Sequence, residues 1–396
     1  MFGSIFGARA YAYEIYVNVD GRWRLDKRLE GDAKLTQNGN EQLEKSAIAQ
    51  ANALLNMGDY SAVKVVRSRS RSDGFTTQTE IFNKAATARP KVMTTRPFKG
   101  LFPICETPFD LTRRPAVKGV SAVFREFLDK QNATSLELLH SPQHQRKLND
   151  MSNFMRAGFY ALAGAQTQPG LPSQGERSRK LEGLFDKLVQ RTRDAMAERS
   201  LPAFENNDFA LLHEKLKTRF QGDDLRFLFF FQSAKVTQTM PSYAARLDAA
   251  LNDMIARPSE ATNPLLDEVA AACLDSTTLI QELLGPKPNL AEALGALADL
   301  SAGKLTMPAR PDPTLEKLNT LLGERRLPSC EETLWERILT NLSSKTLLSK
   351  SEPKKEWQMT RNLNHKLLSV APAAYKEAID HAGQMRMERV RNMDSY

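Results

Sequence analysis

The residues best suited to chemistry in this chain are a small group of cations and one aromatic side chain near the N-terminus. They are Arg22, Trp23, Arg24, Arg67, Arg69 and Arg71. In an extended strand alternate side chains point to the same side, so the run from Arg67 to Arg71 predicts three guanidinium groups on one face. Cations beside an aromatic ring on an exposed sheet can contact phosphates and stack a base. These residues are therefore our candidates for binding nucleic acid or another partner.

A simpler interpretation competes with this one. Arg67 to Arg71 continue the row begun by Val63 and Val65, past the part of the strand that a helix would cover. Such a row describes a solvated hairpin tip, and charge there also prevents edge-to-edge aggregation. Trp23 would then be a core residue. We favour this solvated-surface interpretation, because the sequence contains no recognised nucleic-acid-binding signature.

A partial metal site is a second hypothesis. Glu137, His140 and His144 would share one face of a continuous helix, and these residue types can bind zinc. However, Pro142 lies between the two histidines and is expected to break that helix. A closed zinc site also needs four ligands, and no second Glu-x-x-His motif completes a two-metal site. We therefore expect ordinary surface histidines and no metal.

Other catalytic signatures are absent from the sequence. It contains no phosphate-binding glycine loop, no Gly-x-Gly-x-x-Gly after a strand and no Gly-x-Ser-x-Gly motif. Cys105, Cys273 and Cys330 are widely spaced and odd in number, which argues against disulfides and for a reducing compartment. The acidic pairs at 223–224 and 331–332 fall at expected helix N-termini, where they complement the helix dipole. We expect no cofactor and no catalytic residue, although spacing does not reveal a site assembled from distant residues.

The N-terminal candidates are positioned by a small domain, which we assign to residues 10–84. Apolar and polar residues alternate over residues 13–19, which predicts a half-buried strand. Asp20-Gly21 predicts a tight hairpin turn to a second strand. An amphipathic helix over residues 40–57 and strands over residues 62–71 and 75–82 follow. The order ββαββ predicts an antiparallel sheet with the helix across one face.

A proline-rich, basic linker is predicted over residues 85–118. Its prolines recur at positions 90, 97, 103, 108 and 115, and proline favours extended chain or loop. The net charge of +8 is concentrated in the first third of the chain, this linker included. Because the segment also contains apolar residues such as Phe98 and Phe102, we expect part of it to lie as a strap on the helical domain. The alternative is that it docks onto another protein.

Residues 119–396 are predicted to form a large all-α domain. We find no fixed repeat in it, which favours an irregular helix bundle over a solenoid. The run from Phe227 to Phe231 contains four phenylalanines and is far too short to cross a bilayer. A helix that is apolar all round must be enclosed, so this run predicts the central helix of the bundle.

Two helix starts and the C-terminus carry further signals in this domain. Asn289 with Glu292, and Ser329 with Glu332, match the capping-box spacing. Met and Arg alternate over residues 385–393, which predicts a weakly packed terminal helix. The alternative for this segment is a methionine stripe that binds a partner.

The chain is therefore predicted to be an α+β protein, with a small N-terminal ββαββ antiparallel-sheet domain and a large all-α domain. Its composition, 41% hydrophobic and 26% charged, is ordinary for a soluble globular protein. No signal peptide or membrane-spanning segment is recognisable, so we expect a cytoplasmic location and no membrane partner. We expect a non-enzymatic protein-interaction protein, an adaptor or regulatory subunit with an unidentified protein partner. The alternative is a nucleic-acid-binding protein that uses the basic N-terminal sheet and linker.

Overall fold

The computed structural model describes residues 11–19, 21–30, 37–56, 59–70, 76–85, 93–96, 98, 100–205, 208–307, 310–350 and 353–393. Packing divides the chain into two compact units, residues 1–93 and residues 94–396. The first unit contains the sheet and the second contains the large helical region.

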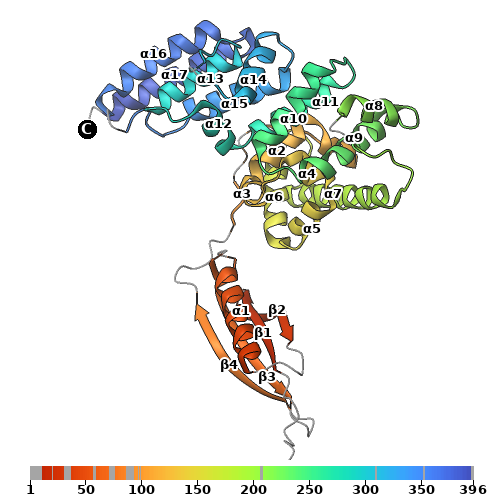
Figure 1. Ribbon diagram of the computed structural model, residues 1–396. Helices are drawn as coiled ribbons and strands as arrows, with labels where there is room; N and C mark the ends of the chain where they lie inside the picture. The colour runs from red at the N-terminus through yellow and green to blue at the C-terminus, as the bar shows by residue number, and fades with distance from the viewer. Residues whose placement is uncertain are drawn as a thin grey trace, which may run out of the picture. The chain divides into compact units, whose positions relative to one another are not determined.

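The N-terminal unit is a four-stranded antiparallel sheet with one helix, which confirms the predicted ββαββ order. Its elements are β1 (Tyr11–Val19), β2 (Arg22–Glu30), α1 (Gln37–Asn56), β3 (Ala62–Ser70) and β4 (Thr76–Ala85). The strand order is β2-β1-β3-β4, so β2 and β4 are the outer strands. Figure 1 shows α1 lying across one face of this sheet.

Alternation along β1 and β3 explains which face the helix covers. Ile15, Val63 and Val65 are fully buried, and they pack in one hydrophobic core with Ala47 and Ala51 of α1. Because successive side chains of a strand point to opposite faces, the residues between these point away from α1. The face on which they lie is called the open face.

The β1–β2 hairpin turns at Gly21, as the sequence predicts. Its φ of 82° lies in the left-handed region that favours glycine. The Gly21 backbone N–H donates to Asn18 Oδ1 at 3.1 Å, which stabilises the turn. Predictions also fell on Asp20, Arg71 and residues 86–92, which lie outside the described residues.

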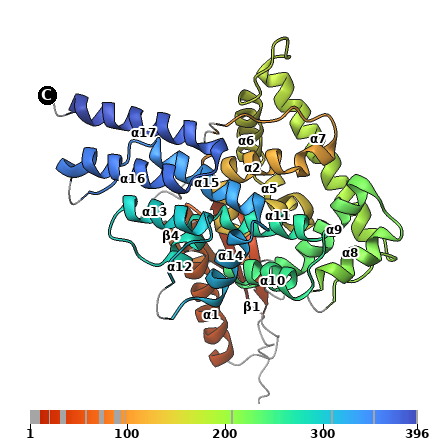
Figure 2. The same cartoon turned by 90° about the horizontal axis from the view of Figure 1, so that it is seen from above.

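The second unit is a large helical region. It comprises η1 (Pro108–Thr112), α2 (Arg114–Val123), α3 (Arg125–Gln131), α4 (Ser135–His140), α5 (Pro142–Asn149), α6 (Ser152–Gly164), α7 (Gln174–Ala197), α8 (Phe209–Lys217), α9 (Gly222–Thr237), α10 (Tyr243–Ala256), α11 (Asn263–Leu274), α12 (Thr277–Leu284), α13 (Leu290–Ser301), α14 (Pro313–Gly323), α15 (Pro328–Leu342), η2 (Pro353–Lys355), α16 (Glu356–Val370) and α17 (Ala373–Met393). The last two helices pack side by side, as Figure 1 and Figure 2 both show. In the described ranges we find no helix that combines the length and apolar character needed to cross a bilayer.

The phenylalanine run of helix α9 is enclosed on every side, as the sequence predicts. Each residue from Phe227 to Phe231 is at most 2% exposed. Rings from other elements contact this run, and the ring centroids of Phe209 on α8 and Phe229 lie 6.1 Å apart. The acidic pair 223–224 lies in the first turn of the helix, where it complements the dipole as predicted.

Residues 100–112, part of the predicted strap, pack on the helical unit, where η1 contacts α2 and α7 and Phe102 contacts α2 and the end of α6. The backbone N–H of Phe102 donates to the carbonyl of Ala165, just after α6, at 3.0 Å. The Phe102 ring is buried and packs so closely on Gly119 of α2 that a Cβ there would lie 2.5 Å from it. Helix α2 begins at Arg114, so the helical structure starts a few residues earlier than the sequence indicates.

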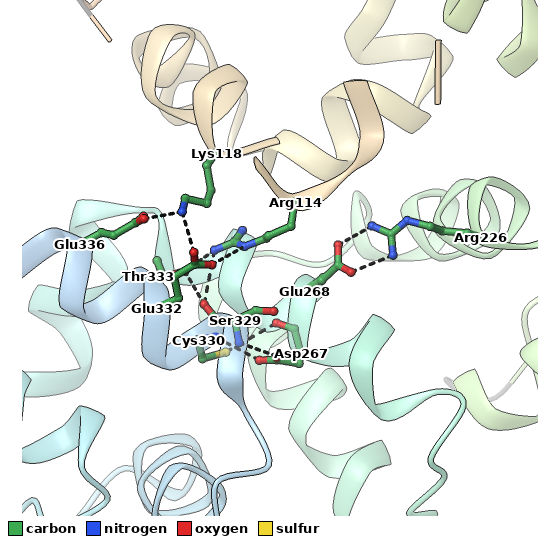
Figure 3. Close-up of polar contacts among 10 residues, drawn as sticks. All are labelled: Arg114, Lys118, Arg226, Asp267, Glu268, Ser329, Cys330, Glu332, Thr333 and Glu336. Carbon is green, nitrogen blue, oxygen red and sulfur yellow. Dashed lines mark hydrogen bonds and ion pairs between the residues drawn. The ribbon is translucent and has the colours of Figure 1, made fainter. Parts of the chain in front are cut away.

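Helices α11 and α15 run parallel and cap each other. The Asp267 carboxylate of α11 accepts hydrogen bonds from the backbone N–H groups of Ser329 (2.7 Å) and Cys330 (3.1 Å), at the start of α15 (Figure 3). In return, the Arg337 guanidinium of α15 donates to the carbonyls of residues 274–276 at the end of α11. An anion at a helix N-terminus and a cation at a C-terminus both complement the helix dipole.

This arrangement corrects one of the two predicted capping boxes. Asn289 is the N-cap of α13, and its Oδ1 accepts a hydrogen bond from the Glu292 N–H at 2.9 Å, so the N-cap half of this predicted box is confirmed. The box predicted at Ser329 is wrong, because α15 is preceded by Leu327, which makes no side-chain cap. Its acceptor is instead Asp267, which lies 62 residues away from Ser329 in the sequence.

The terminal helix α17 is anchored, which corrects the prediction of weak packing. The guanidinium of Arg386 is buried, pairs with Glu356 of α16 at 2.7 Å and donates to the carbonyl of Leu342 at 3.0 Å. Met385 is 46% exposed. The arginine of this Met/Arg pattern therefore makes the buried contact, because buried carbonyls and a carboxylate satisfy its donors.

Replacing Asp267 by alanine should leave two N–H groups at the start of α15 without an acceptor. We expect D267A to lower the free energy of unfolding by about 2–4 kcal/mol, measured by urea denaturation. The matched control is D299A, which removes a carboxylate from the more exposed Asp299–Lys366 pair and should cost about 1 kcal/mol or less. Equal losses in the two variants would contradict the capping role.

Candidate functional site on the N-terminal sheet

The pairing register places the candidate aromatic residue on the open face. Trp23 lies opposite Asn18 and Leu25 opposite Tyr16, and both β1 residues alternate with the core residue Val17. The side chains of Trp23 and Leu25 are 38% and 52% exposed. The expectation that Trp23 is a core residue is therefore wrong, because among the described elements only α1 covers the sheet, and it covers the other face.

A lysine side chain lies over the exposed tryptophan. Lys64 Nζ of β3 is 4.7 Å from the centroid of the Trp23 ring and 5.6 Å from that of Tyr16. The same ammonium group pairs with Glu80 of β4 at 3.7 Å. Cation–π attraction of this kind positions the tryptophan ring while leaving part of it accessible.

Glu14 is the centre of the polar contacts on the open face. It is only 7% exposed. It accepts a hydrogen bond from the Tyr16 hydroxyl at 2.9 Å and forms an ion pair with Arg28 at 3.6 Å. The hydrogen bond to Glu14 raises the pKa of Tyr16. Arg28 and Lys64 are thus both paired with carboxylates, so neither of these two described cations carries an unpaired charge on this face.

Three cations of β2 lie on the opposite face of that strand, on the same side as α1. These edge cations are Arg22, Arg24 and Lys27, paired in register with Val19, Val17 and Ile15. All three side chains are exposed, and none forms an ion pair with a described residue. Their charge is therefore available to a ligand.

Lys27 joins this row because of a β-bulge. The register shifts between Ile15 and Tyr16, so Asp26 is an extra residue in β2. In a regular strand residue 26, and not residue 27, would share a face with Arg24. Sequence reasoning missed Lys27 for this reason, since simple alternation assigns it to the wrong face.

The predicted arginines of β3 lie at the other end of the sheet. Arg67 of β3 lies opposite Tyr13 of β1, whereas Arg24 of β2 lies opposite Val17. Tyr13 and Val17 are four residues apart along β1, which corresponds to about 13 Å. Arg67 forms an ion pair with Glu44 of α1 at 3.5 Å. Arg69 follows on the same side of β3, and its guanidinium lies 5.7 Å from the ring centroid of Tyr11. The predicted set thus divides into three parts. Arg22 and Arg24 lie at one end of the sheet, Arg67 and Arg69 lie at the other end, and Trp23 lies on the open face.

His140 and His144 of the helical unit are buried, which corrects the expectation that they lie on the surface. Helix α4 ends at His140 and α5 begins at Pro142, so the predicted helix break is confirmed. His140 is fully buried, with Nδ1 at 2.8 Å from the carbonyl oxygen of Leu136. Burial lowers the pKa of His140 to about 3 and that of His144 to about 4. The buried neighbour Glu137 pairs with the guanidinium of Arg246 (3.1 Å), not with a histidine.

The described residues do not form a catalytic arrangement that we can identify. Within them no group of three His, Cys, Asp or Glu side chains could hold a metal ion. Burial raises the pKa of the Cys105 thiol to about 12, which disfavours the reactive thiolate. An open hollow of about 440 Å³ between α6 and α7 is lined by residues that include Tyr160 and Arg179. Glu137 and Asp267, whose pKa values burial raises, do not line it.

Comparisons of the chain with protein-family models, with curated proteins and with solved structures found no match.

Acid should destabilise the helical unit through His140 and His144. Both have a folded-state pKa far below the ordinary value of 6.5, so between these values the unfolded chain binds more protons. Stability therefore falls as the pH falls below 6.5, by about 1.4 kcal/mol per pH unit for each histidine. We expect the free energy of unfolding to drop by about 4 kcal/mol between pH 7 and pH 5 from these two residues.

The variant H140F should remove about half of this pH-dependent loss, because phenylalanine does not titrate and suits a site between Phe227 and Phe230. Urea denaturation at pH 7 and pH 5 measures the loss. The control H365Q changes an exposed histidine and should keep the wild-type difference. An unchanged pH dependence in H140F would show that His140 does not contribute.

Proposed function

We propose that this chain is a non-enzymatic protein-interaction protein, an adaptor or regulatory subunit, whose N-terminal unit binds a protein partner through the open face of its sheet. The observation that supports this most is the exposure of Trp23, together with Leu25, on a face that α1 does not cover. Tryptophan is enriched among the residues that dominate binding energy at protein interfaces. A cytoplasmic location belongs to the same proposal.

The charges of the open face favour a protein partner. Its cations Arg28 and Lys64 are held by Glu14 and Glu80, so the surface around Trp23 combines apolar area with paired charges. An exposed apolar centre with a polar surround is the usual anatomy of a protein interface. The sheet also holds the surface rigid, which reduces the ordering cost of binding.

The edge cations favour nucleic acid binding as a second candidate function. Arg22, Arg24 and Lys27 are exposed and free of ion pairs with described residues, so they could contact phosphates. Trp23 points to the other face of β2, however, so a base stacked on it would lie away from these cations. Such binding would weaken steeply as salt rises.

Capture of partners from cell lysate by the full-length protein tests the proposal. We expect a nuclease-resistant protein partner whose recovery by W23S/L25S falls by about tenfold or more, since removal of a hot-spot aromatic costs at least about 2 kcal/mol. The matched control is Y160S/M196S, which removes two exposed apolar side chains from the helical unit and should keep capture.

Two outcomes would contradict the proposal. One is a partner that is captured equally by wild type and W23S/L25S. The other is recovery of nucleic acid by the wild-type protein. If nuclease, moderate salt and the R22S/R24S substitutions each abolish this recovery, the second candidate function is favoured. Circular dichroism of each variant verifies that the fold is intact.

A further inference from the structure

We infer that the free edge of β2 binds an extended segment of the partner, in which acidic residues alternate with apolar ones. This inference rests on the proposed function and specifies the chemistry of the partner. One outer strand, β2, has on one face cations that form no ion pair with a described residue, and on its other face exposed apolar side chains.

The outer backbone edge of β2 is the first feature that fits an added strand. Strand β2 pairs with β1 along one side, and no described strand pairs with its other side. Eight of its nine residues are exposed and the ninth is partly exposed. An extended peptide can join such an edge as an additional strand, with main-chain hydrogen bonds for affinity and side chains for specificity.

The edge cations form a regular row along β2. Arg22, Arg24 and Lys27 lie opposite every second residue of β1, so they are spaced by about 6.6 Å. Alternate side chains of an added antiparallel strand would repeat at the same spacing and on the same face. Carboxylates at these positions would each face one unpaired cation, and opposite charges directly across a sheet stabilise the pairing.

The other face of the same strand carries exposed apolar side chains. Trp23 and Leu25 alternate with the edge cations and lie on the open face. The residues that alternate with the carboxylates of an added strand would lie beside these two side chains. Apolar residues there would bury exposed area, and aromatic or branched cross-strand pairs are favourable. The resulting partner pattern is acidic on one face and apolar on the other.

Other occupants fit this edge less well. A second copy would bring its own edge cations against the first, and like charges across strands are unfavourable. Residues 1–10 contain no acidic residue, so they lack the required carboxylates. A nucleic acid strand could contact the edge cations but would leave Trp23 and Leu25 on the far face, whereas an added strand uses both faces. Cations on an edge also discourage indiscriminate pairing, and an acidic segment overcomes that barrier selectively.

Fluorescence anisotropy with the full-length protein tests this inference. The probe is a labelled peptide in which glutamate and valine alternate over about eight residues, close to the length of β2. The control peptide has the same composition, with all glutamates first and all valines after them. We expect the alternating peptide to bind about tenfold more tightly, because only alternation sorts charge and apolar surface onto separate faces.

Variants of the protein locate the site. R22S/R24S/K27S should weaken binding of the alternating peptide by about tenfold, and K45S/R67S/K84S, which removes three cations elsewhere in the same unit, should change it by less than about twofold. Two further peptides carry N-methyl groups either on the odd-numbered or on the even-numbered residues. One of these two peptides should not bind, because in an added strand only every second N–H group faces β2.

Each contrary outcome overturns the inference. Equal binding of the two peptides, or equal losses in the two triple variants, would show attraction by net charge alone. Tighter binding of single-stranded oligothymidylate than of the peptide, lost in R22S/R24S/K27S, would assign the edge to nucleic acid. If the peptide does not bind but wild type still captures a protein partner that W23S/L25S does not capture, this inference is rejected and the proposed function stands.

Discussion

Enclosure of the phenylalanine run in α9 is the constraint on which the helical unit depends. A helix without a polar face loses stability wherever water reaches it, so α4, α7, α8 and η1 pack around this one. The same enclosure removes water from His140, whose ring centroid lies 5.2 Å from that of Phe227, and this burial lowers the pKa of His140. At the start of α9, Arg226 forms two hydrogen bonds to Glu268 of α11 (Figure 3), which links the central helix to the next layer.

Buried and half-buried charges in this unit orient helices against one another. Arg114 and Lys118 of α2 both pair with Glu332 of α15, and Asp267 caps the same helix from α11 (Figure 3). Charged groups removed from water must be paired or hydrogen-bonded, and each of these is. These side chains therefore have structural roles that account for their positions.

The N-terminal sheet obeys a different constraint. One helix covers one face, so the pleat leaves Trp23 and Leu25 on a surface that no described element covers. The bulge at Asp26 then aligns Lys27 with Arg22 and Arg24 on the other side of β2. This edge strand thus presents two chemically different faces, and both the proposed function and the inferred partner pattern derive from that division.

Features that depend on neighbours in sequence were predictable from the sequence. The ββαββ order, the enclosed α9, the break at Pro142 and the cap at Asn289 follow from alternation, apolar periodicity and backbone chemistry. Each of these signals acts over a few residues, so it is present in the chain before any long-range contact forms.

The tertiary structure decided which of the same side chains are buried and which are exposed. Trp23 is exposed because no described element covers its face, whereas His140 and Arg386 are buried because distant segments close over them. The cap from Asp267 and the alignment of Lys27 depend on a helix pairing and a strand register that local patterns do not specify. Burial and register are set by contacts between residues far apart in the chain, and this is why the sequence alone located the candidate residues but did not arrange them.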